Sequence, residues 1–290
     1  MFNRLLGGAG RVLITVGVVI LLFVAFQLWG TGLEQAAHQD DLGHSFGAKV
    51  LGKKKAHAAT ADAEQAEDAV IQDLSKVDPA TAPPTSAARE GDSIGIIEIP
   101  KIGVRQFFVE GVAKPDLKKG PGHYPGTPLP GQAGNAAIAG HRTTYGAPFN
   151  RIDELQPGDP IYVYTLQGKF RYEVLAPRPN VGIQNGPGWF SVKPTETWVI
   201  APTGDNRLTL TACHPKRSAA QRIVVQAKLA AEPAPAATTT TSPGQPATED
   251  ATKGLEQAEA SLGGDASAKW PALAWGLGFA AVYAGAWVAA

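Results

Sequence analysis

The sequence contains very little cysteine and no excess of charge of either sign. One cysteine in 290 residues excludes an intramolecular disulfide framework and a cysteine-based zinc cage, because both need several thiols. The 26 Lys and Arg residues are balanced by 26 Asp and Glu residues, so the basic excess that is usual in nucleic-acid-binding proteins is missing. We therefore expect no nucleic-acid partner, and the single thiol requires an explanation of its own.

Charge is also missing from a long apolar stretch near the N-terminus. The run VLITVGVVILLFVAFQLW over residues 12–29 is about as long as a bilayer-spanning helix requires. Arg4 and Arg11 precede it, which favours a cytoplasmic N-terminus. We predict a cytoplasmic segment over 1–11 and a transmembrane anchor over 12–29, with the bulk of the chain extracellular. The alternative is a cleaved signal peptide, although no small-residue cleavage site closes the run.

A second uncharged stretch covers residues 270–290. It is rich in Ala and Gly, so its transfer into a bilayer is less favourable per residue than that of the first stretch. Its length nevertheless suits a membrane span. We predict a second transmembrane segment here, which would make the chain a two-pass rather than a single-pass protein of the cell membrane.

Two further stretches contain few large apolar residues. Residues 30–90 are dominated by Ala, Gln, Asp, Glu and Lys, which predicts an extracellular helical or disordered stalk that buries little surface. Residues 231–269 include EPAPAATTTTSPGQP, which is typical of a low-complexity linker rich in Pro, Ala and Thr. The remaining residues, 91–230, have the size of one folded domain.

This domain has the pattern of a mainly β protein. Short β-rich runs are separated by Gly, Pro, Asn and Asp turns, at 94–99, 105–109, 136–140, 160–164, 169–176, 198–201, 207–212 and 222–229. Eight such runs predict a barrel or a sandwich. We also expect helical turns at 115–118 and 151–155.

The single cysteine lies at the end of one of these runs. If residues 208–212 form a strand, alternation places one face toward the core and the thiol of Cys213 on the other face. The first face carries Leu208, Leu210 and Ala212, and the second carries Thr209, Thr211 and Cys213. In the next run the same alternation places Arg222 on the face away from the core. Cys213 and Arg222 can therefore share one face of neighbouring strands, where a guanidinium favours the reactive thiolate.

A reactive thiol also needs a base, and six histidines are available. Three of them lie in the predicted stalk and are interpreted as solvated: His38, His44 and His57. His214 directly follows Cys213 and should point to the opposite face, while His123 lies in the turn-rich PGHYPG and suits a surface or turn-packing role. His141 ends an apolar strand and opens the loop HRTTYGAP, where rigid structure holds an accessible side chain.

Three segments together resemble the sortases, membrane-anchored cysteine transpeptidases of Gram-positive bacteria. They are IGIIEIPKIGV at 94–104, GHYPGTPLPGQAGNAAIAGHRTTYGAPF at 122–149 and TLTACHPKRSAAQRIVVQAKL at 209–229. The resemblance implies an eight-stranded β-barrel over the catalytic domain 91–230. It also implies that His141, Cys213 and Arg222 are the catalytic residues. Ala212 departs from the TLxTC signature, which commonly has Thr there, so a hydroxyl beside the nucleophile is missing.

The same resemblance implies an activity. Exported proteins with a C-terminal sorting signal of the LPXTG kind would be cut between Thr and Gly, leaving a thioester on Cys213. Arg222 would stabilise the oxyanion, and His141 would protonate the leaving amine. The acceptor would be an amine such as that of a lipid-linked peptidoglycan precursor. Because the mechanism needs thiolate and imidazolium together, it predicts a bell-shaped pH profile.

Within the family, LWGTGLEQAAHQDDL at 28–42, HRTTYGAPF and CHP look most like class E, the housekeeping-type enzymes of high-GC actinobacteria. That class implies a preference for LAXTG over LPXTG. We predict Tyr145 and Thr211 as substrate-binding residues, Tyr145 at the pocket for the second signal position; the alternative for Tyr145 is a loop tyrosine that packs on the barrel.

Other functions remain open at this point. A pilin-polymerising sortase would transfer to a lysine, a cell-wall cysteine peptidase to water, and a membrane-tethered module without turnover would only bind the peptide. We expect no cofactor and propose no metal, because the carboxylates Asp153, Glu154 and Asp159 suit a solvent-exposed helix and turn better than a calcium site.

Overall fold

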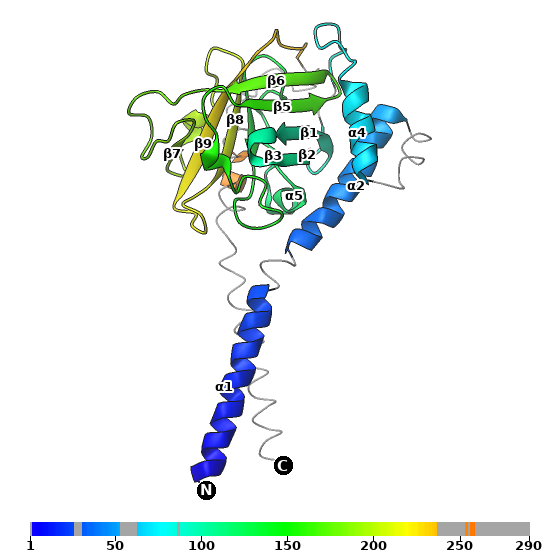
Figure 1. Ribbon diagram of the computed structural model, residues 1–290. Helices are drawn as coiled ribbons and strands as arrows, with labels where there is room; N and C mark the ends of the chain where they lie inside the picture. Colours follow the sequence, from blue (N-terminus) through cyan, green and yellow to red (C-terminus); the bar gives the residue numbers. More distant parts are fainter. Residues whose placement is uncertain are drawn as a thin grey trace.

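A closed β-barrel forms the centre of the computed structural model, which describes residues 2–25, 31–52, 63–85, 88–236, 253–254 and 256–258. Its strands are β1 (Ser93–Ile99), β2 (Val104–Glu110), β3 (Gly122–His123), β4 (Asn135–Ala139), β5 (Pro160–Thr165), β6 (Gly168–Val174), β7 (Phe190–Val192), β8 (Arg207–His214) and β9 (Gln221–Leu229). They follow the order β6-β5-β1-β2-β3-β4-β8-β9 (Figure 1), and pairing of β6 with β9 closes the ring. The short β7 pairs antiparallel with residues 222–224 of β9, outside the ring. The predicted eight-stranded barrel is thus confirmed.

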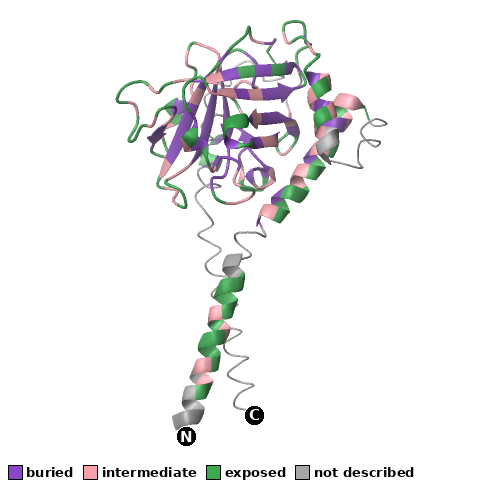
Figure 2. Ribbon diagram, in the orientation of Figure 1, coloured by how far each residue is buried: buried purple, intermediate pink, exposed green. Residues whose placement is uncertain are grey.

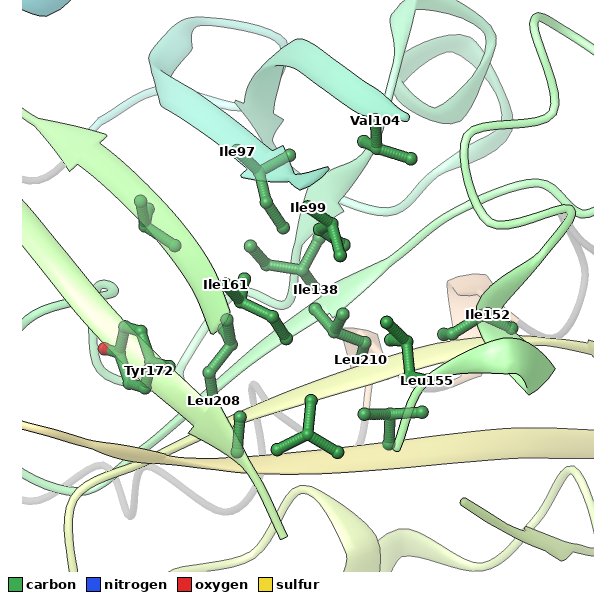
Figure 3. Packing of buried hydrophobic residues seen from close by; sticks show 14 of the residues in the cluster. Ile97, Ile99, Val104, Ile138, Ile152, Leu155, Ile161, Tyr172, Leu208 and Leu210 are labelled. Carbon is green, nitrogen blue, oxygen red and sulfur yellow. The ribbon is translucent and has the colours of Figure 1, made fainter. Parts of the chain in front are cut away.

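The barrel is filled by apolar side chains from alternate strand positions. Ile97 and Ile99 of β1 meet Ile138 of β4 and Leu208 and Leu210 of β8 in the interior (Figure 3). Each of these five residues is fully buried. A small barrel packed in this way is a solid core and not a channel, so any reaction site must lie on its outside.

Seven of the eight predicted strands are present, and one is wrong. Residues 197–199 form the 3-10 helix η5 (Thr197–Val199), because the Ile200 N–H bonds back to the Thr197 carbonyl at 3.1 Å. The strands β3 and β7 were not predicted, since two or three residues are too few to display alternation. The predicted helical turns correspond to α5 (Lys114–Lys119) and to the 3-10 helix η4 (Ile152–Glu154), while a further 3-10 helix, η3 (Pro100–Ile102), follows β1.

Two helices from the predicted stalk pack against the barrel. They are α2 (Thr31–Leu51) and α4 (Ala63–Leu74), whose buried faces meet the sheet in Figure 2. Phe46 is fully buried with Val70 against Ile96 and Phe107, and the Gln39 side chain bonds both backbone groups of Phe107, at 2.8 and 3.0 Å. The prediction that this stretch buries little surface is therefore wrong for both helices. A few apolar residues spaced one helical turn apart are enough to dock them.

The remaining predicted segments lie partly outside the described residues. The helix α1 (Phe2–Ala25) covers most of the predicted cytoplasmic segment and anchor, but residues 26–29 and all of 270–290 are outside the described part. No helix in the described part of the chain combines the length and the hydropathy that a membrane crossing requires. The two transmembrane segments therefore stay predictions. Most of the predicted linker 231–269 lies outside the described residues, and within its described part Ala234 and Ala258 are buried in apolar clusters.

Candidate active site

Three adjacent strands bring the predicted catalytic residues together. β4 and β8 are parallel neighbours with Ala139 opposite Thr211, and the Gly140 N–H continues the ladder to the Thr211 carbonyl at 3.0 Å. This register sets His141 beside the end of β8 that carries Cys213. β8 and β9 are antiparallel with Cys213 directly opposite Arg222. The structure thus gathers these residues at one edge of the barrel, and their catalytic roles stay a prediction.

Cys213 lies on the outer face of β8. Ala212 and Leu210 point into the barrel interior, whereas Cys213 packs against a second apolar cluster that includes Ala139 and Val224. The predicted alternation of this strand is confirmed. Burial raises the pKa of the Cys213 thiol above its ordinary value, and the charges of Arg222 and Arg142 oppose that rise.

His141 is held in a mostly buried position. Only 8% of the residue is exposed, and its carbonyl accepts the Phe149 N–H at 3.1 Å, which closes the loop on itself. Gly140 is needed at the start of this loop, because a Cβ there would lie 2.6 Å from the Phe149 ring. Burial lowers the pKa of His141 to about 4. Together with the raised pKa of Cys213, this makes the neutral thiol and imidazole the dominant pair at neutral pH.

Arg222 presents a buried hydrogen-bond donor. Its Nη1 donates to the carbonyls of Ala219 and Gln221, both at 3.1 Å. Its Nη2 is buried and has no hydrogen-bond partner among the residues that the structure describes. An unsatisfied buried donor is costly, and a guanidinium N–H beside a nucleophile is suited to an oxygen that gains negative charge during a reaction.

The two predicted substrate-binding residues differ in exposure. Tyr145 is half-buried in the loop after β4, with its ring 5.0 Å from the His141 ring and 5.4 Å from the Lys118 Nζ. Thr211 is 1% exposed, and its hydroxyl shares a 2.8 Å hydrogen bond with the Tyr124 hydroxyl. The structure therefore places Thr211 beneath the surface and leaves Tyr145 as the one of the two that reaches it.

A charged network beside Cys213 was not predicted. Arg142, whose side chain is 2% exposed, pairs with Asp153 at 3.0 Å and donates to the Cys213 carbonyl at 3.2 Å. The Asp153 side chain is 34% exposed and pairs with the buried Arg142, so the predicted solvent-exposed face holds for it only in part. Glu154 pairs with the exposed Arg151 as a surface residue would. The sequence offered one signal for this network, the arginine that directly follows His141. It did not indicate the carboxylate partner, which lies eleven residues further along the chain.

The remaining histidines of the domain have structural surroundings. His123 is buried, with its ring nitrogens 2.8 Å from a Glu110 carboxylate oxygen and 2.9 Å from the Pro128 carbonyl, so a surface role is wrong and a packing role fits. His214 bonds Arg142 and Gln184. In the described part of the chain, no group of three or more His, Cys, Asp or Glu residues is arranged to hold a metal ion.

Comparisons with known proteins all point to one family. The family model of the sortase domain matches residues 97–230. Sortase SrtE1 of Streptomyces coelicolor is 32% identical over 240 residues, which are 77% of this chain and 56% of that protein. Sortase SrtE2 of the same organism is 27% identical over 227 residues, 76% of this chain and 80% of that protein. The solved structure of sortase E from Streptomyces avermitilis is 34% identical, covers 49% of this chain and 91% of that one, and has a TM-score of 0.41.

Proposed function

The chain belongs to the sortase family, whose members are cysteine transpeptidases, and we propose that it cleaves a C-terminal sorting signal of the LAXTG/LPXTG type between Thr and Gly. The protein upstream of the cut is held as a thioester on Cys213 and transferred to an amine. One observation carries the proposal: parallel β4–β8 pairing and antiparallel β8–β9 pairing converge on His141, Cys213 and Arg222. The similarity to Sortase SrtE1 and Sortase SrtE2 of Streptomyces coelicolor supports a class E enzyme, the class for which the sequence resemblance implies an LAXTG preference.

The first half-reaction forms the thioester. The proton of the Cys213 thiol passes to His141, and the thiolate adds to the Thr carbonyl carbon. The carbonyl oxygen becomes negative and is stabilised by Arg222, whose buried Nη2 has no hydrogen-bond partner among the described residues. When the Thr–Gly bond breaks, its electron pair goes to the glycine nitrogen, which takes the proton from His141.

The second half-reaction releases the protein. The acceptor amine adds to the thioester carbonyl and gives its proton to His141, while the carbon–sulfur bond breaks and restores the thiolate. We propose that the acceptor is an amine of a lipid-linked peptidoglycan precursor. A membrane anchor over residues 12–29, with the barrel outside the cell, would hold the enzyme close to such a precursor and to exported client proteins.

The residue that departs from the family signature does not favour an inactive binding module. Ala212 is fully buried in the barrel interior, on the opposite face of β8 from Cys213. A hydroxyl at this position would face the apolar core and would not lie beside the thiol. The three proposed reacting groups are all present, so turnover is favoured over binding alone.

The test uses the full chain in detergent with an LAXTG peptide, an LPXTG peptide and an added amine, with products identified by mass spectrometry. We expect an amine-linked product, formed faster from LAXTG, and none with Cys213→Ala. Tyr145→Phe and Tyr145→Ala then test the pocket: an unchanged LAXTG/LPXTG ratio removes the role of Tyr145. Hydrolysis despite excess amine would indicate a peptidase, and peptide binding without any product would indicate a module without turnover.

A further inference from the structure

We propose that Arg142 is a positioning residue of this active site: its buried guanidinium ties the loop that carries His141 to the end of β8 and sets a second cation beside Cys213. The proposal rests on the proposed function for its effect on turnover, but its effect on the thiol can be measured without any substrate.

The guanidinium makes contacts to three separate groups. Nη1 lies 3.2 Å from the Cys213 carbonyl oxygen and 2.9 Å from the His214 Nδ1, and Nη2 lies 3.0 Å from an Asp153 carboxylate oxygen. The Arg142 carbonyl in turn accepts a 2.8 Å bond from the Asn150 side-chain amide. One residue therefore links the His141 loop, the nucleophile strand and η4.

These contacts fix the protonation of His214. Because Arg142 can only donate, the His214 Nδ1 must accept, and its Nε2 donates to the Gln184 side-chain oxygen at 2.8 Å. Burial and then the charge of Arg142 lower the pKa of His214 below its ordinary value. His214 is thus held neutral as a structural spacer, which leaves the proton transfers to His141.

The charges around Cys213 come from several elements. Arg222 approaches from β9, Arg142 from the loop after β4 and Asp153 from η4, while His141 and the buried Tyr124 hydroxyl are neutral at pH 7. The two arginines are the groups that favour the thiolate. The negative charge of Asp153 partly offsets the positive charge of Arg142 at the thiol. The position of the guanidinium therefore matters for the reactivity of Cys213 in addition to its charge.

Lysine cannot replace this arginine. The planar guanidinium reaches a backbone carbonyl, an imidazole nitrogen and a carboxylate at once, whereas a single ammonium group occupies one point. We therefore expect Arg142→Lys to keep part of the electrostatic effect and to lose the link between the loop and β8.

The experiment measures the pH dependence of alkylation of Cys213 by iodoacetamide. Because the chain has one cysteine, the rate reports on this thiol alone. We expect Arg142→Gln to raise the apparent pKa of the thiol and to slow alkylation at pH 7 by about threefold to tenfold, and Asp153→Asn to shift the pKa in the opposite direction. In peptide turnover, Arg142→Lys and Arg142→Gln should lower kcat by at least about tenfold with a KM near that of the wild type.

Arg151→Gln is the matched control, because Arg151 is an exposed arginine on the same loop that pairs with Glu154. It should leave both the alkylation profile and turnover unchanged. If folded Arg142→Gln and Asp153→Asn both kept the wild-type alkylation profile, the proposal would be overturned. Should Arg142→Gln fail to fold, Arg142→Lys and Asp153→Asn decide the question. If the wild-type chain did not turn over either peptide, that result would instead count against the proposed function.

We also infer that residues 253–254 and 256–258 cover the apolar cluster against which Cys213 packs. On the proposed function, a sorting signal that reaches Cys213 must displace them. This second inference rests on a different observation: Ala258 is 1% exposed and belongs to the same apolar cluster as Tyr124, Ala139 and Val192, against which Cys213 packs. Gly254 lies so close that a Cβ on it would be 3.3 Å from Pro125 and 3.6 Å from Tyr124. Figure 1 shows the described segments 253–254 and 256–258 in orange beside the barrel.

The covering group is a segment of the chain itself. Its release should change the KM for the peptide and leave kcat unchanged. A covering segment lowers the fraction of binding-competent molecules and raises the apparent KM in proportion. Ala258→Asp would bury a charge in the apolar cluster and should release the segment. We expect it to lower the KM for the LAXTG peptide by at least about threefold and to speed the reaction of Cys213 with the bulky thiol reagent DTNB.

Glu256→Gln is the matched control, because Glu256 is exposed in the same segment. It should change neither the KM nor the DTNB rate. An Ala258→Asp chain with the wild-type DTNB rate and KM would contradict the inference. The DTNB rate remains informative even if the peptide is not a substrate, which separates a failure of this inference from a failure of the proposed function.

Discussion

The two faces of β8 differ in what a change of side chain should affect. The inner face presents Leu208, Leu210 and Ala212 to the barrel core, whereas the outer face carries Thr211 and Cys213. From residue 208 to residue 212 both faces are buried, so exposure alone does not separate them there. The difference is chemical: the inner face is uniformly apolar, and the outer face has a thiol opposite a buried arginine. The account therefore assigns stability to one face and catalysis to the other.

The outer face should show the largest effect at Arg222. Arg222→Gln removes the positive charge and the buried Nη2 donor, and we expect kcat/KM for the LAXTG peptide to fall by about 10²–10³, the range for loss of an oxyanion donor. Steady-state kinetics on the full chain measures this. A fall of less than threefold, in a variant that melts like the wild type, would remove Arg222 from the reaction.

The pH profile sharpens the outer-face chemistry. Because the pKa of His141 is lowered to about 4 and that of Cys213 is raised, kcat/KM should be broadly flat between these limits. Below pH 4 the imidazole and the thiol are both protonated, so the rate should fall about tenfold per pH unit. Above the pKa of the thiol neither group carries a proton, so no proton is available for the leaving amine and the rate should fall again. An acid limb near pH 6.5 would instead indicate an exposed, unperturbed histidine.

The inner face should respond in stability alone. Leu210→Ala leaves a cavity in the closed core, and we expect the free energy of unfolding to fall by about 2–5 kcal/mol. Urea denaturation measures that loss, while kcat per folded molecule should remain within about twofold of the wild type. A tenfold loss of kcat in the folded fraction would show that the two faces are not independent.

The smallest effect is expected at Ala212. Ala212→Thr restores the residue of the family signature but places a larger, polar side chain in the apolar interior. We expect a loss of stability of about 1–3 kcal/mol and a change in kcat below about threefold. A large gain in kcat would mean that the missing hydroxyl limits the reaction after all.

The same contrast explains how much the sequence could predict. Alternation along β8 and β9 sufficed to place Cys213 and Arg222 on one face, because register is fixed wherever one face is buried. The docked helices were missed although β1 and β2 carried a signal: Ile96 and Ile97 are consecutive apolar residues, and so are Phe107 and Phe108. Strands of this kind are covered on both faces, here by the core and by α2 and α4.

Other features had no local pattern to reveal them. The pairing of Arg142 with Asp153 depends on how the loop after β4 folds back, which no periodicity encodes. β3 has two residues and β7 has three, which are too few to display a recognisable alternation. The buried positions of Ala234 and Ala258 depend on distant partners in the barrel, so composition alone indicated only a linker.

The most direct test of the central claim is the intact mass of the full chain incubated with an LAXTG peptide and no amine acceptor. The account predicts a covalent adduct whose mass equals the peptide up to and including its threonine, carried by Cys213, released by hydroxylamine and absent in Cys213→Ala. An adduct that persists in Cys213→Ala, or product formation without any adduct on Cys213 under single-turnover conditions, would contradict it.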